Sequence, residues 1–333
     1  MRSTAQWVGG EKRRFAADAT GGRVEKTPAP VNPPRLRAHP LGASASMILF
    51  SALARRCLAV AALSGLASMR LSAAAAEELV KFDGAVPRLH QVEQRPARDG
   101  KADERGRPLI QGYLTKPNGR GPFPALVLLH SCLGLPANRQ SIADALALQG
   151  YVALFVDDFA ARGLKETCAV DFPDALPDAF GALAFLSRRP FVDPNRIGVV
   201  GWSQGGDTAL EIAASRSASA FAVADGAKFK AAAAFYPPCE NLGDARLRIA
   251  TLILVGESDD VTPAADCRRL AEAQPSDGAD VRLIVYPGAA HGFDNPEFGE
   301  GLRAYGMSLR YDRDAAERAK SELRDFLATR LAR

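Results

Sequence analysis

The feature that most constrains the fold is the stretch RIGVVGWSQGG, which ends at Gly206. Residues 197–200 are a short apolar, β-branched run, typical of a strand buried on both faces, and a helix is expected to begin near Gly206. The motif Gly-x-Ser-x-Gly requires a turn so sharp that Ser203 is strained, and Gly201 and Gly205 keep side chains out of its way. The sequence therefore predicts a nucleophile elbow.

The residue after Ser203 is expected to place a hydrogen-bond donor beside the serine hydroxyl. The backbone N–H of Gln204 should point toward the serine hydroxyl, and the N-terminus of the following helix favours developing negative charge. The five-residue motif alone arises often by chance, so the strand before it and the helix after it carry the inference.

The first 76 residues differ in composition from the rest. Residues 1–46 are rich in Pro, Gly, Ala and Arg without apolar periodicity, and we interpret them as an untranslated or disordered extension. Residues 47–76 combine a basic start, a 13-residue apolar run and a small-residue end, which indicates a secretory signal peptide. The apolar run is too short for a membrane anchor.

Basic residues are concentrated in this front part. Residues 1–76 hold 11 Lys and Arg against 3 Asp and Glu, whereas residues 77–333 hold 31 against 35. The excess of basic over acidic residues thus lies in the part that we expect to be absent from the mature protein. No nucleic acid partner is expected, and no membrane partner once the signal peptide is removed.

Residues 77–333 are expected to form one α/β domain. Residues 77–107 alternate turn signals with apolar pieces and, with 109–114, predict a hairpin at one sheet edge; His90 is interpreted as a surface residue. Farther on, strands alternate with helices, which is typical of a mostly parallel, doubly wound sheet with helices on both faces. The predicted strands are 125–130, 151–156, 197–200, 231–236, 251–255 and 281–286, and the predicted helices include 139–148, 177–186, 263–273 and 308–331.

Two loops at the carboxyl ends of predicted strands carry further chemistry. One strand leads into Asp259 and Asp260, and the next leads into His291. With Ser203 they follow the chain order of α/β-hydrolases, in which histidine takes the serine proton and the acid orients the imidazole. The chain has only four histidines, and His291 is the one that follows the acid.

The identity of the acid stays open between the two aspartates. Thr262 and Pro263 have the character of an N-cap and a first helical residue, so that Asp260 would complete the turn into the helix. This argument favours Asp259 and leaves Asp260 as the alternative.

Four cysteines follow residue 76, an even set that is expected to pair in an oxidising compartment. Each lies just beyond a predicted strand or in the first helical turn after one, so all four should gather at the carboxyl end of the sheet. Cysteines that follow consecutive strand–helix units should lie close together, which predicts disulfides between Cys132 and Cys168 and between Cys239 and Cys267. Four free thiols in a cytoplasmic protein are the alternative.

Several motifs can be compared with known families: GWSQGG, GESDDVTPAADC, YPGAAHGFD, and VLLHSCLGL together with VDDFAARG. In combination they resemble the dienelactone hydrolase family from about residue 108 onward. The resemblance implies an α/β-hydrolase fold and a serine-using member of that family. The residues it implies are a triad of Ser203, Asp259 and His291, and an oxyanion hole from the backbone N–H groups of Gln204 and Cys132.

The chain departs from the founding members of that family. They carry cysteine where this chain has Ser203 and glutamate where it has Ser131, so neither their thiolate mechanism nor their lactone substrate is expected to transfer. Arg162 lies near the position where the family holds a substrate carboxylate. An ion pair with Asp157 or Asp158 is the alternative.

The sequence thus predicts a periplasmic or secreted serine hydrolase that cleaves a small ester or lactone through an acyl-enzyme. Trp202, beside the nucleophile, is expected either to contact substrate or to pack in the core. No cofactor or metal is expected, because zinc-type Cys or His spacings, HExxH and phosphate-binding loops are absent from the sequence. The alternatives are a serine peptidase of the prolyl-oligopeptidase type and a catalytically idle binding protein.

Overall fold

The computed structural model describes residues 76–85, 109–170, 172–214, 221, 223 and 226–332. The expected N-terminal extension, the expected signal peptide up to its last residue, and His90 lie outside the described residues. Within these ranges, no helix combines the length and the apolar content that crossing a bilayer requires.

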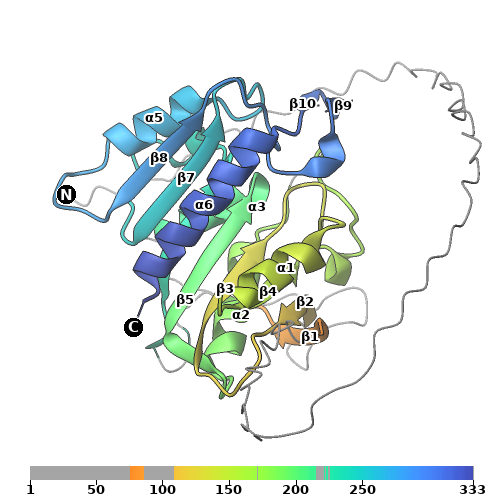
Figure 1. Cartoon of the computed structure of the whole chain (residues 1–333), viewed down its shortest axis with the longest axis vertical. Coiled ribbons are helices and arrows are strands. Elements are labelled where there is room, and N and C mark those ends of the chain that lie inside the picture. Colours follow the sequence, from red (N-terminus) through yellow and green to blue (C-terminus); the bar gives the residue numbers. More distant parts are fainter. Residues whose placement is uncertain are drawn as a thin grey trace, which may run out of the picture. The chain divides into compact units, whose positions relative to one another are not determined.

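An eight-stranded mixed sheet forms the centre of the described domain, in the order β1-β2-β4-β3-β5-β6-β7-β8 (Figure 1). Strands β3 to β8 are parallel to one another, while β1 and β2 form the expected antiparallel edge beside β4. The strands are β1 (Glu78–Asp83), β2 (Leu109–Thr115), β3 (Phe123–Leu129), β4 (Val152–Asp157), β5 (Val192–Trp202), β6 (Phe229–Phe235), β7 (Ala250–Gly256) and β8 (Val281–Tyr286).

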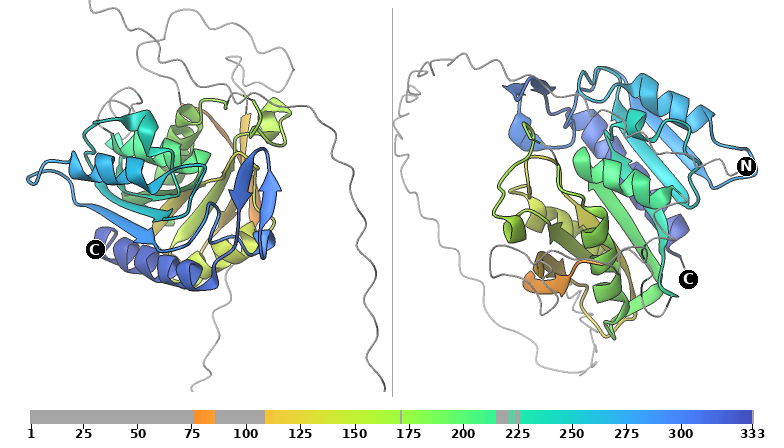
Figure 2. Two further views of the ribbon diagram at one scale, coloured as in Figure 1. Left: turned by 90° about the horizontal axis from the view of Figure 1, so that it is seen from above. Right: turned by 180° about the vertical axis from the view of Figure 1, so that it is seen from behind.

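Helices cover both faces of this sheet, as Figures 1 and 2 show. Leu126 and Leu128 of β3 pack beneath one helical layer and Val127 and Leu129 beneath the other, because successive strand residues point to opposite faces. Each fully buried aliphatic side chain of this kind contributes about 1.5–3 kcal/mol to folding. The first layer consists of α1 (Arg139–Leu148) and α6 (Arg313–Arg330), and the second of α2 (Leu176–Ser187), α3 (Gln204–Ala213) and α5 (Ala264–Glu272). The doubly wound α/β fold predicted from the sequence is confirmed.

The C-terminal helix begins later than expected. Residues 302–309 form a small hairpin of β9 (Leu302–Ala304) and β10 (Met307–Leu309), in place of the helical turn predicted from residue 308. The two-residue loop between them, Tyr305 and Gly306, has positive φ angles of 53° and 76°, as a tight hairpin requires. Helix α6 then starts at Arg313, where the Asp312 side chain accepts a hydrogen bond from the N–H of Ala315.

The structure also differs from the expectation at the start of α5. The helix begins at Ala264 with Pro263 in the N-cap position and no side-chain cap, so Thr262 is not the N-cap. The Thr262 hydroxyl donates instead to the Asp259 carboxylate, at 3.1 Å from Oδ2. Thr262, whose place before Pro263 suggested the start of a helix, therefore stabilises the loop that carries Asp259.

Both disulfides expected from the sequence are formed. Cys132 is bonded to Cys168 with a Cα–Cα separation of 4.9 Å, and Cys239 to Cys267 with a separation of 5.0 Å. They close sequence separations of 36 and 28 residues, for which the chain-entropy account gives about 3–4 kcal/mol of stabilisation each. The first ties the loop after β3 to the segment after β4, and the second ties the loop after β6 to α5.

Candidate active site

Ser203 occupies the sharp turn between β5 and α3. Its φ of 51° and ψ of −111° lie in a region that residues with a Cβ rarely adopt, and α3 begins at the next residue, two positions before the expected Gly206. A Cβ on Gly205 would overlap the carbonyl oxygen of Leu129, and one on Gly201 would overlap the carbonyl oxygen of Gly205. The two motif glycines are therefore required by close backbone approach, which places Ser203 at the carboxyl end of the sheet.

Ser203, His291 and Asp259 form one continuous chain of contacts. Nε2 of His291 lies 3.0 Å from Ser203 Oγ, and Nδ1 lies 2.9 Å from Asp259 Oδ2. His291 and Asp259 are 3% and 6% exposed, so this contact is shielded from water. The three side chains come from the loops after β5, β8 and β7.

Of the two adjacent aspartates, Asp259 reaches the imidazole. Its Oδ1 accepts hydrogen bonds from the backbone N–H groups of Val261 and Thr262, at 2.9 and 2.8 Å, which leaves Oδ2 directed at His291. Asp260 is exposed, and its side chain accepts a bond from the N–H of Ser308 at 3.3 Å. The loop thus holds one carboxylate inward and the other outward.

The loop after β3 lies beside Ser203 and is anchored at several points. The N–H of Leu133 donates to Ser131 Oγ and the N–H of Gly134 donates to the Ser131 carbonyl, which makes a tight turn around Cys132. The carbonyl of Cys132 accepts from the N–H of Thr167 at 2.8 Å, and the Cys132 sulfur is bonded to Cys168. A disulfide sulfur is no thiolate, so the Cys132 side chain supplies no nucleophile.

His130 lies behind this loop and forms an ion pair with Asp158. Its Nε2 is 2.6 Å from Asp158 Oδ1, and its Nδ1 is 2.8 Å from the Ser131 carbonyl oxygen. Burial alone would lower the pKa of His130, but the hydrogen bond and charge of Asp158, with the Ser131 carbonyl and Asp157, raise it above its ordinary value. The pair fixes the end of β3 relative to the end of β4.

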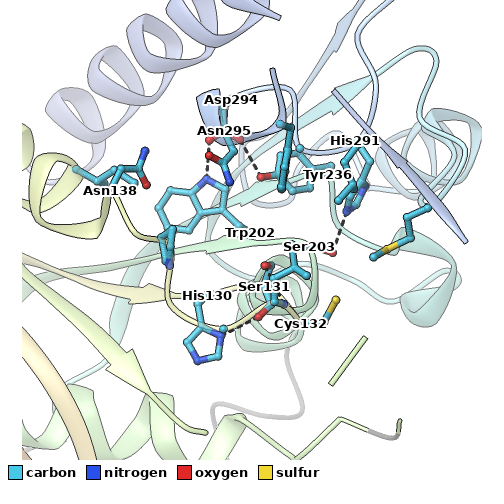
Figure 3. Close-up of a pocket in the computed structure, with 18 residues that line it drawn as sticks. His130, Ser131, Cys132, Asn138, Trp202, Ser203, Tyr236, His291, Asp294 and Asn295 are labelled. Carbon is cyan, nitrogen blue, oxygen red and sulfur yellow. Dashed lines mark hydrogen bonds between the residues drawn. The ribbon is translucent and has the colours of Figure 1, made fainter. Parts of the chain in front are cut away.

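A pocket opens over Ser203 (Figure 3) and contains about 610 Å³ of space, its open mouth included. Its exposed wall is mainly apolar, and a small number of polar side chains, Ser203 and His291 among them, interrupt it, which is typical of small-molecule sites. The lining residues are His130, Ser131, Cys132, Leu133, Gly134, Pro136, Asn138, Ile142, Trp202, Ser203, Tyr236, His291, Gly292, Asp294, Asn295, Phe298, Met307 and Leu309.

Arg162, for which the resemblance implied a contact with substrate, is not among these lining residues. Its guanidinium donates to Asp178 Oδ2 at 2.7 Å and to the carbonyl oxygen of Asp158, so the expected alternative named the wrong carboxylate. Burial raises the pKa of Asp178 to about 7, against the opposing effect of Arg162. The arginine is thus the ion-pair partner of a buried acid on α2.

Trp202 lies at the border between the pocket and the hydrophobic core. The indole lines the pocket, and it also stacks on Phe155 and Phe235 with ring centroids 6.0 and 5.4 Å away. Its N–H donates to Asp294 Oδ2 at 2.8 Å. The ring is therefore part of the core on one side and part of the pocket on the other.

Several lining residues were missed by the sequence analysis. Tyr236 and Asp294 directly follow β6 and the His291 turn, so their place at the carboxyl ends of strands was a usable signal. Met307 and Leu309 come from the β9–β10 hairpin, a segment that the sequence analysis assigned to helix from residue 308.

Residues 110–331 match the dienelactone hydrolase family, a range that contains the whole site described above. The chain belongs to this family. It is accordingly a carboxylic ester hydrolase with the α/β-hydrolase fold.

Individual relatives are distant. A Synechocystis protein provisionally named carboxymethylenebutenolidase is 23% identical over 55% of this chain and 81% of its own length. A similarly named Yersinia pestis protein is 27% identical over 56% of this chain and 74% of its own. Among solved structures, a dienelactone hydrolase-like promiscuous phosphotriesterase from metagenomic libraries matches with a TM-score of 0.53 and 20% identity, over 78% of this chain and all of its own. This last similarity shows the fold alone.

Proposed function

We propose that this dienelactone hydrolase family member is an exported serine esterase that cleaves small esters or lactones through an acyl-enzyme. The observation that carries the proposal is the chain of contacts from Ser203 through His291 to Asp259, at 3.0 and 2.9 Å. Contacts of this length allow a proton to pass from the serine to the imidazole as the serine attacks.

In the proposed mechanism, Asp259 accepts the Nδ1–H of His291, which leaves Nε2 as the base. Ser203 Oγ attacks the ester carbonyl carbon while its proton moves to Nε2, and the carbonyl oxygen becomes an oxyanion. The collapse of this intermediate expels the alcohol, which takes the proton from Nε2. Water then attacks the acyl-enzyme by the same route in reverse and releases the acid, restoring Ser203.

The oxyanion is assigned to the backbone N–H groups of Gln204 and Cys132. The N–H of Gln204 is the first of α3 and therefore has no acceptor within the helix. Cys132 is held by its disulfide and by the bond from Thr167 to its carbonyl. A donor fixed before the reaction needs no reorganisation as charge develops, which is the source of oxyanion stabilisation.

Export is also part of the proposal. Two disulfides in a domain of this kind are expected to persist in an oxidising compartment, and the segment 47–76 has the composition of a signal peptide. Both observations point toward the periplasm or the exterior of the cell.

Ester and amide substrates distinguish this proposal from a peptidase. We expect p-nitrophenyl esters with short acyl chains to be hydrolysed, with kcat/KM falling once the acyl chain outgrows the pocket, and aminoacyl p-nitroanilides to be cleaved far more slowly. Steady-state kinetics over a series of acyl lengths measure this. Turnover of the anilides alone would assign a peptidase, and turnover of neither class would favour an idle binding protein.

A further inference from the structure

Asp294 joins two aromatic rings of the pocket wall. Its Oδ2 accepts the indole N–H of Trp202 at 2.8 Å, and its Oδ1 accepts the phenol O–H of Tyr236, also at 2.8 Å (Figure 3). Trp202 ends β5, Tyr236 follows β6 and Asp294 follows β8, so one carboxylate connects three loops of the pocket.

The two rings adjoin the reacting groups. Trp202 directly precedes Ser203 in the chain, and the Tyr236 ring stands edge-on to the His291 imidazole with centroids 4.6 Å apart. Stacking on Phe155 and Phe235 restrains the indole plane, but the hydrogen bond to Asp294 is what fixes its polar edge. The position of Asp294 therefore sets the shape of the wall beside Ser203.

The carboxylate also brings a negative charge to the pocket wall. The indole N–H of Trp202 can only donate, and the Tyr236 phenol donates its O–H to the same carboxylate. Burial together with the charge and hydrogen bond of Asp294 raises the pKa of Tyr236. Burial raises the pKa of Asp294 itself, and the hydrogen bonds from Tyr236 and Trp202 oppose that rise. In the described part of the chain, the lining of this pocket contains no Lys or Arg to balance a carboxylate.

We propose that Asp294 is the specificity-determining residue of this site: it holds Trp202 and Tyr236 as a fixed aromatic wall, and its negative charge disfavours acyl groups that carry a carboxylate. The substrate class is then an uncharged ester or lactone with an apolar acyl group. This inference rests on the proposed function and narrows it. The inference also disfavours substrates whose carboxylate would be bound by Arg162, because that guanidinium is paired with Asp178.

Two variants separate the charge from the hydrogen bonds. Asp294→Asn removes the charge and can keep both contacts, since its carbonyl oxygen accepts from Trp202 and its amide group donates to the phenol oxygen of Tyr236. Asp294→Ala removes both contacts as well. The exposed Asp260 offers a matched control, because Asp260→Asn removes a nearby charge from outside the pocket lining.

The substrates are 4-nitrophenyl hexanoate and mono-4-nitrophenyl adipate, which have the same acyl length and differ by a terminal carboxylate. We expect Asp294→Asn to raise kcat/KM for the adipate ester relative to the hexanoate about tenfold, mainly through KM, as a charge several Å away in a partly wet site would. Asp260→Asn should leave the ratio unchanged. Asp294→Ala should lower kcat/KM for both esters and shift the fluorescence emission of Trp202.

An unchanged ratio in Asp294→Asn, with hexanoate turnover retained, would overturn the assignment. Binding of hexanamide and of adipic acid monoamide, followed through Trp202 fluorescence, makes the same comparison without turnover. Tighter binding of hexanamide by the natural protein, and loss of that preference in Asp294→Asn, supports the inference even if esters are not cleaved. If both proteins prefer hexanamide to the same extent, the inference is overturned. Because this comparison needs no turnover, its failure is distinguishable from failure of the esterase proposal.

Discussion

Ser203→Ala is expected to lower kcat for ester hydrolysis about 10⁶-fold while leaving the fold intact, because members of a serine triad act as one unit. The variant removes the atom that would form the acyl-enzyme, and the remaining oxyanion donors supply only residual rate enhancement. The small Ala side chain also fits the space of the serine. Initial rates with 4-nitrophenyl hexanoate measure the effect, and a denaturation curve shows that folding is unchanged.

Ser131 supplies the matched control for this variant. Ser131 also lines the pocket, but its hydroxyl accepts a bond from the N–H of Leu133 at 3.3 Å, and Nε2 of His291 contacts Ser203. Ser131→Ala is expected to reduce the rate far less than Ser203→Ala. A collapse of activity in Ser131→Ala with near-normal turnover in Ser203→Ala would move the nucleophile to the loop after β3.

Asp259→Asn is expected to lower kcat about 10⁴-fold. The carboxamide would offer an N–H to Nδ1 of His291 and so favour the tautomer that is protonated at Nε2, which cannot accept the serine proton. The carboxamide oxygen can keep the bonds from the N–H groups of Val261 and Thr262. The Thr262 hydroxyl loses Oδ2 as an acceptor but still has the Tyr236 carbonyl oxygen at 3.1 Å, so the loop should hold its conformation. The comparison variant is Asp260→Asn, which should keep kcat close to that of the natural protein.

The pH dependence of kcat separates this explanation from a general loss of structure. A wrong tautomer should slow the reaction at every pH near neutrality without unfolding the protein, whereas a collapsed loop would also raise KM and lower the midpoint of denaturation. If Asp260→Asn is the slower variant, the acid of the triad is Asp260 and the orientation of this loop differs in the active protein.

The elbow was predictable because it depends on local geometry alone. A strand, a strained serine and a helix in direct succession leave no space for a Cβ at Gly201 or Gly205, and this requirement is visible in the sequence. The disulfide pairs were predictable for a related reason. Parallel strands deliver their carboxyl ends to one edge of the sheet, so cysteines that follow neighbouring units meet.

Other features depend on contacts that a single sequence does not reveal. The β9–β10 hairpin was merged with a helix because its signal is one Tyr-Gly pair at the turn, followed by a long amphipathic run. The family resemblance placed Arg162 near substrate, and its ion-pair partner Asp178 was not predictable because it lies on a separate helix. The link from Asp294 to Trp202 spans 92 residues and exists only once β5 and β8 belong to one sheet.

The most direct test of the central claim is the site of covalent labelling by a fluorophosphonate. We expect one label per chain, on Ser203 within the tryptic peptide 197–216, with ester hydrolysis lost in proportion to labelling. Fragment spectra distinguish Ser203 from Ser215 in that peptide. Full inhibition with the label on another residue, or complete labelling of Ser203 with hydrolysis retained, would contradict the account.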